Sequence, residues 1–159
     1  MEQKELFVKM ILDRWNTSIE NCTKLLQKLT DEQLEKEVAP NKNRGIYIFG
    51  HLIAAHDNVI TLLNLGEKLY PELNEPFLIN PDKVSTELPS VETLRAYWTK
   101  QCEVLQDKIA SLSSDQWFEK HTAVSAEDFV NEPHRNKLNI IITRTTHLQY
   151  HIGQLILLK

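Results

Sequence analysis

The sequence is poor in glycine and cysteine, and each shortage excludes a class of protein. Only 4 glycines occur among 159 residues and none is clustered, so glycine-rich phosphate loops and dinucleotide-binding fingerprints are absent. The 2 cysteines, Cys22 and Cys102, lie far apart without a CxxC motif, which argues against a disulfide framework and a thiolate zinc site. We therefore expect neither a nucleotide-binding α/β fold nor a cysteine-stabilised domain.

Long apolar runs and excess positive charge are also missing. Apolar runs span only a few residues, and charged residues recur through residues 1–20, so we expect no membrane span and no secretory signal. The net charge of −4 offers no basic surface to nucleic acid. A chain with 42% apolar and 25% charged residues can form a core without a metal or a disulfide. We expect one globular domain over residues 1–159, located in the cytoplasm.

Apolar residues recur at helical spacing in two long segments. In residues 11–29 and again in residues 94–112, successive apolar positions are separated by 4, 4, 3, 4 and 3 residues, which predicts an amphipathic helix in each. The segments superpose at an offset of 83 residues, which aligns Trp15 with Trp98. A capping box is predicted after each segment, at Thr30–Gln33 and Ser113–Gln116. We interpret the pattern as an internal duplication. The alternative is that any two bundle helices share this apolar spacing of three and four residues.

A second long helix is predicted after each of these segments. Residues 44–66 and 137–158 are the two candidates, and the latter is apolar over much of its circumference. Residues 70–89 hold four of the six prolines and predict a long crossover, after which Ser90 caps the third helix. Residues 119–136 predict a second long loop. The fold class expected is therefore all-α, a four-helix bundle with a long crossover between helices 2 and 3.

The histidine pattern predicts a metal site. His147 and His151 are four residues apart in the most apolar helix, so both imidazoles lie on one face, one turn apart, which is the spacing of two ligands of one ion. His51 occupies a similar place in the first half of the chain and is the natural third ligand. Three neutral imidazoles suit zinc, nickel, copper or iron and leave coordination positions open. The alternative is that these are ordinary packed histidines.

Two amides are candidates for the surroundings of this site. Asn58 and Gln154 each follow a predicted ligand by seven residues and return to nearly the same helical face. They could accept a hydrogen bond from an imidazole or line a pocket, the alternative being that each caps a buried backbone group. Gly153, inside the last predicted helix, indicates a close approach between helices.

The remaining histidines are expected to lie elsewhere. His56 is five residues after His51, about 140° around the helix, so it should look sideways or outward. Asp57 falls on the wrong side of the helix to act as a base beside the site. His121 and His134 belong to the long loop and should be exposed, with a ligand role at the bundle mouth left open. Cys22, Cys102, Trp15 and Trp98 are predicted to be core residues.

Three segments of the chain resemble the DinB/YfiT-like family of helical bundles. They are IFGHLIAAHDN, LPSVETLRAYW and the closing THLQYHIGQL. The resemblance implies an up-down-down-up bundle that forms a homodimer and binds a divalent metal at one end. It places the metal ligands at His51, His147 and His151. The metal implied is nickel or zinc, with iron, copper or manganese as alternatives.

The resemblance implies an activity only in outline. Some relatives are transferases or isomerases that depend on a low-molecular-weight thiol, so the first hypothesis is a thiol-dependent S-transferase or detoxification enzyme with a small-molecule substrate. The alternatives are a metal-dependent hydrolase and a non-catalytic helical binding or dimerisation module.

Overall fold

The regular secondary structure of the computed structural model, which describes residues 2–85 and 87–159, is helical. No β-strand occurs in these two ranges, so the predicted all-α class is confirmed. The long helices are α1 (Gln3–Lys28), α3 (Gly45–Leu62), α4 (Val91–Ala110) and α6 (Lys137–Leu155). The shorter ones are α2 (Asp31–Leu34), η1 (Pro71–Leu73), η2 (Glu75–Ile79), η3 (Gln116–Phe118), α5 (Ala126–Asn131) and η4 (Ile156–Leu158).

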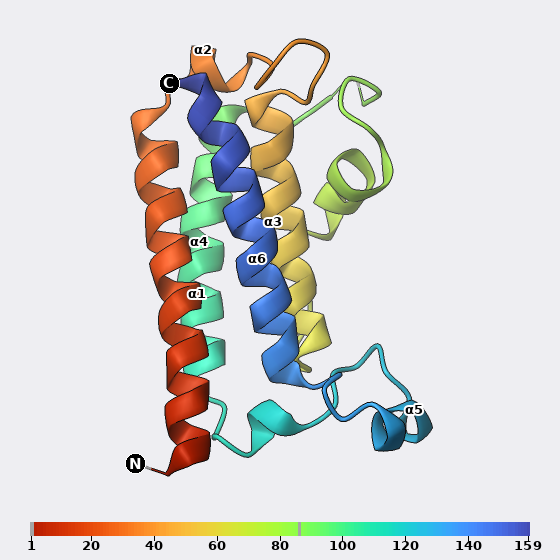
Figure 1. The fold of residues 1–159 in the computed structure, drawn as a ribbon. Helices are drawn as coiled ribbons and strands as arrows, with labels where there is room; N and C mark the ends of the chain where they lie inside the picture. The colour runs from red at the N-terminus through yellow and green to blue at the C-terminus, as the bar shows by residue number, and fades with distance from the viewer. Residues whose placement is uncertain (1, 86) are drawn as a thin grey trace.

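The four long helices lie side by side along one axis (Figure 1). In that view α1 and α6 run upward, whereas α3 and α4 run downward. Because α3 and α4 point the same way, the chain between them returns along the bundle, through η1 and η2, before α4 begins. The predicted crossover of residues 70–89 therefore holds two short helical turns.

Local hydrogen bonds explain where several helices begin. Both predicted capping boxes are present, Thr30–Gln33 before α2 and Ser113–Gln116 before η3. Ser90 Oγ accepts a hydrogen bond from the backbone N–H of Thr93 at 3.1 Å, so the predicted cap of the third long helix is confirmed. The order of long helix, capping box and long helix thus occurs in both halves of the chain.

Three details differ from the sequence-based expectations. The helix predicted to run to Gly66 ends at Leu62, and Gly66 follows in the left-handed region with φ of 125°. The predicted loop of residues 119–136 contains the short helix α5. A Cβ atom at Gly153 would meet nothing within 4 Å, so the predicted close helix approach there is wrong.

The core is apolar and includes three of the four residues predicted for it, whereas Cys102 is partly buried and packs against it. Trp15 and Trp98 are each 3% exposed, and Cys22 is fully buried. Burial raises the pKa of Cys22 and raises that of Cys102 to about 12, so neither thiol ionises near neutral pH. None of the helices in the described ranges combines the length and hydropathy that crossing a bilayer would need.

Candidate metal centre

Three imidazoles from two helices meet inside the bundle. His51 lies in the second turn of α3, and His147 and His151 lie one turn apart near the end of α6. The Nε2 atom of His147 is 3.0 Å from Nε2 of His51 and 3.2 Å from Nε2 of His151. One ligand atom from each residue lies within 4.8 Å of the others. Two nitrogens bound to one zinc ion lie about 3.0–3.4 Å apart, given metal–nitrogen bonds near 2.0–2.1 Å, so the spacing fits a shared ion.

Two hydrogen bonds fix which nitrogens carry protons. His51 Nδ1 lies 2.8 Å from the backbone carbonyl oxygen of Phe77, which can only accept, so this Nδ1 holds the proton. His151 Nδ1 lies 2.7 Å from Gln154 Oε1 and donates to it, while Gln154 Nε2 donates to the Tyr150 hydroxyl at 3.2 Å. With both Nδ1 atoms protonated, the Nε2 lone pairs of His51 and His151 converge on the space beside His147.

The surroundings favour the neutral form of His147 and His151. Burial, reinforced by the charges of its histidine neighbours, lowers the pKa of His147 to about 4. Burial also lowers the pKa of His151, although the hydrogen bond with Gln154 opposes the shift. Metal ions bind the neutral imidazole, so these ligand atoms need not lose a proton first at neutral pH.

The two predicted amides have different places. Gln154 contacts His151, as described, whereas Asn58 lies two turns beyond His51, about 10 Å along the helix axis. Within the described residues, no hydrogen bond joins the Asn58 side chain to the three histidines, and its backbone oxygen accepts from the Thr61 hydroxyl at 3.1 Å. The structure therefore brings one of the two amides to the site.

The expectation that His56 looks sideways or outward is wrong. His56 is fully buried, with ring centroids 5.0 Å from Trp15 and 5.5 Å from Trp98. The reason is that α3 is covered on nearly all sides, so a residue 140° from His51 is still interior. Both ring nitrogens lack a hydrogen-bond partner among the described residues, and burial lowers the pKa of His56 to about 3.

The other titratable candidates do not reach the three histidines. Asp57 is buried and accepts hydrogen bonds from the backbone N–H of Tyr70 at 2.6 Å and from Gln101 Nε2 at 2.8 Å. His121 is half-buried and His134 exposed, in the loop at the lower end of the bundle in Figure 1. The histidine cluster lies toward the opposite end, on the first half of α3 and the last half of α6.

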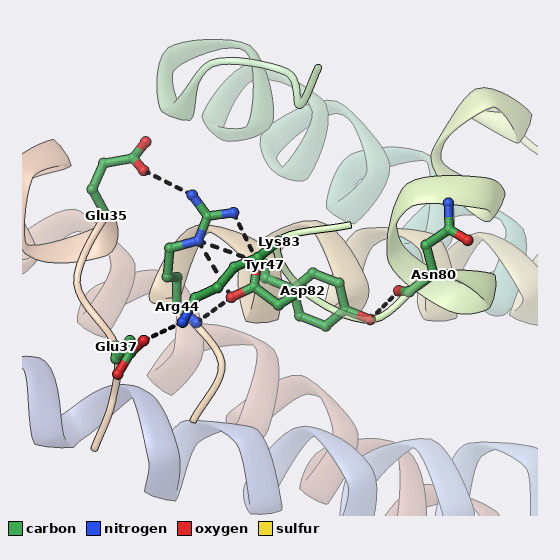
Figure 2. A network of polar contacts seen from close by, with 7 residues as sticks. All are labelled: Glu35, Glu37, Arg44, Tyr47, Asn80, Asp82 and Lys83. Atoms are coloured by element: carbon green, nitrogen blue, oxygen red, sulfur yellow. Dashed lines mark hydrogen bonds and ion pairs between the residues drawn. The ribbon is translucent and has the colours of Figure 1, made fainter. Parts of the chain in front are cut away.

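Contacts from the crossover hold His51 in place, and sequence reasoning missed them. Arg44 Nη2 donates to Asp82 Oδ1 at 2.8 Å, and the backbone N–H of Arg44 donates to Asp82 Oδ2 at 2.8 Å (Figure 2). The Tyr47 hydroxyl donates to the carbonyl oxygen of Asn80 at 2.7 Å, and its ring stacks on His51 with centroids 6.4 Å apart. These contacts fasten the crossover beside the start of α3.

The site opens toward solvent on one side. His147 lines a shallow surface depression along α6 together with Ile142, Thr143, Thr146 and Tyr150. A small molecule can therefore approach the cluster from the α6 face.

Comparison with known proteins agrees with this description. The profile of the DinB superfamily matches residues 14–155. The solved structure of a conserved protein from Enterococcus faecalis is similar in fold, with a TM-score of 0.53 over 98% of each chain and 14% sequence identity. No curated protein matches the chain.

Proposed function

The chain belongs to the DinB superfamily, and from that premise we propose that it binds a divalent metal ion through His51, His147 and His151. The observation that carries the proposal is the convergence of Nε2 atoms at 3.0 Å and 3.2 Å, with two of the rings fixed through their Nδ1 atoms. The Nε2 lone pairs of His51 and His151 both face Nε2 of His147, an arrangement that fits a cation held among the three rings.

The ligand atoms available in the cluster narrow the choice of metal ion. Three imidazole nitrogens and no carboxylate form the cluster within the described residues. Nitrogen ligands suit zinc, nickel, copper and iron, whereas manganese prefers oxygen ligands. We propose nickel or zinc, as the family resemblance implies.

We propose a thiol-dependent S-transferase activity at this centre. A divalent ion held by three neutral histidines would act as a Lewis acid that lowers the pKa of a bound thiol or water. The chain supplies an open position on the α6 face and a rigid imidazole cage. Among the described residues no carboxylate joins the cluster as a base for water, and Asp57 is held by Tyr70 and Gln101. Metal-dependent hydrolases commonly use a carboxylate base beside the ion, so the lack of one among the described residues, together with the thiol-dependent relatives that the resemblance implies, favours the transferase over the hydrolase.

The test begins with elemental analysis of protein purified without a histidine tag or a chelator. We expect about one equivalent of nickel or zinc in the wild type, lost in His51→Ala and His147→Ala and retained in His134→Ala, whose side chain is exposed in the distant loop. The loaded protein is then assayed for conjugation of a small thiol to a chromogenic electrophile. Conjugation that persists without metal would contradict the transferase, and ester hydrolysis without any thiol would favour the hydrolase.

We propose further that the four long helices form the up-down-down-up bundle of the family. The helix directions in Figure 1 and the long return between α3 and α4 support it. We also propose a homodimer, which is supported by large apolar side chains left exposed near the start of α1, at Leu6, Phe7 and Met10. Sedimentation equilibrium of the wild type and of Phe7→Glu tests the dimer.

A further inference from the structure

Arg144 is a positively charged side chain directed into the same part of the bundle as the histidine cluster. It lies on α6 three residues before His147, so the two side chains share one face of the helix, with Cβ atoms about 5–6 Å apart. The residue is half-buried, and its Nε atom is fully enclosed.

The Arg144 guanidinium has no partner in the part of the chain that the structure describes. Its Nε is without a hydrogen bond, and no side chain there forms an ion pair with it. Other arginines of the chain are satisfied: Arg44 pairs with Asp82, and Arg95 donates to the carbonyl oxygens of Leu26 and Leu29. A buried N–H donor without an acceptor destabilises a folded chain, so the enclosed Nε of Arg144 calls for a ligand.

The electrostatic surroundings define the charge of that ligand. Burial lowers the pKa of Arg144, with no carboxylate to oppose the effect. A divalent ion at the histidines would add two more positive charges to a cluster that contains no carboxylate among the described residues. An anion is therefore the missing partner.

We propose that Arg144 is the carboxylate-binding residue of the site, so that the substrate or thiol bound there carries a carboxylate near the atom that meets the histidine cluster. This inference deepens the proposed function and rests on it. A planar guanidinium binds a carboxylate through two parallel hydrogen bonds, a geometry that lysine cannot reproduce. The open depression beside His147 lets such a small molecule enter from the α6 face.

The experiment compares two thiols of similar size, 3-mercaptopropionate with a carboxylate and 2-mercaptoethanol without a charge. Their dissociation constants are measured by calorimetry on zinc-loaded wild type, Arg144→Gln, Arg144→Lys and Arg14→Gln. Arg14 is the matched control because it is exposed on α1 and also carries one positive charge. A second arm follows the thermal unfolding midpoint of the chelator-treated proteins with each thiol at equal ionic strength.

In the wild type and Arg14→Gln, 3-mercaptopropionate should bind about tenfold more tightly than 2-mercaptoethanol, the effect of one charge-assisted hydrogen-bonded pair. Arg144→Gln should lose this preference, because its affinity for 3-mercaptopropionate should fall further than its affinity for 2-mercaptoethanol, and Arg144→Lys should keep only part of the preference. In the metal-free arm, 3-mercaptopropionate should raise the unfolding midpoint of the wild type but not of Arg144→Gln.

The two arms separate the inference from the proposed function. An unchanged preference in Arg144→Gln, together with an equal rise in its unfolding midpoint, would overturn the carboxylate site even if the metal binds. A chain that binds no metal but shows the Arg144-dependent rise would overturn the metal centre and leave the anion site standing.

Discussion

The Nδ1 atom of His51 lies 2.8 Å from the backbone carbonyl oxygen of Phe77, a residue of the crossover. A backbone carbonyl cannot be removed by substitution, but the crossover that carries it can be loosened. The link is the contact of Arg44 with Asp82, whose side chain is 4% exposed. Burial alone would raise the pKa of Asp82, yet the hydrogen bonds from Arg44 outweigh it and hold that pKa below its usual value.

Arg44→Gln should therefore weaken metal binding without touching a ligand. Loss of the partners that orient a ligand typically reduces metal affinity about 10- to 100-fold. We expect a reduction of about tenfold, because the Phe77 carbonyl oxygen that binds His51 is still present in this variant. Zinc affinity measured by competition with a chromogenic chelator provides the value. Lys42→Gln, an exposed neighbour, is the control. Equal affinities in the two variants would show that the crossover does not position His51.

Gln154→Leu tests the second orienting contact. The substitution removes the acceptor of His151 Nδ1–H at 2.7 Å, so zinc affinity should fall about tenfold. Because Gln154 is only half-buried, the unfolding midpoint of the metal-free protein should hardly change. The matched control on the same helix is Gln149→Leu, which loses a hydrogen bond to Ser18 and should keep full affinity.

His56 should make the protein sensitive to acid. Its pKa of about 3 in the folded chain lies below the value of about 6.5 expected when unfolded. Between these two pH values the unfolded chain binds a proton that the folded chain does not, so stability falls as the pH falls from about 6.5 toward 3. His56→Leu should remove up to about 1.4 kcal/mol per pH unit from this slope.

Urea unfolding of chelator-treated protein at several pH values measures the slope. His134→Leu is the control because that imidazole is exposed. His56→Leu should also be more stable than the wild type at low pH, since two unpartnered ring nitrogens leave the core. A slope identical to that of the wild type would show that His56 is protonated in the folded chain.

Two glycines should respond oppositely to the same substitution. A Cβ atom at Gly50 would lie 2.3 Å from the Phe77 ring, so Gly50→Ala must displace that ring and should destabilise the protein by about 1–3 kcal/mol. A Cβ atom at Gly153 meets nothing, so Gly153→Ala should stabilise α6 by about 0.5–1 kcal/mol. Urea unfolding measures both, and stabilisation by Gly50→Ala would contradict the packing described here.

The helices and the histidine cluster were within reach of the sequence for a physical reason. Spacing of three and four residues reports directly which side chains share a helical face, and it placed His147 beside His151. The similar order of elements in the two halves of the chain added His51. The structure places the His51 ring beside the rings of His147 and His151. Helix ends were less accurate, as at Gly66, because tertiary contacts decide them.

The features that sequence reasoning missed depend on contacts between residues that are far apart in the sequence. The position of His56 required knowing that α3 is covered on nearly all sides. The Phe77 carbonyl carries no side-chain signal, because every residue has one. Arg144 becomes a candidate binding residue only when the structure shows that its buried Nε has no acceptor among the described residues.

The proposed ligands come from distant parts of the chain, since His51 and His147 are 96 residues apart in sequence. An ion bound to both would close a large loop and so act as a crosslink, whose effect on the unfolded chain grows with the logarithm of loop length. The crossover lies inside that loop. A protease that cut it would leave two fragments held together by the packed helices and, in addition, by the ion, so a chelator should weaken their association.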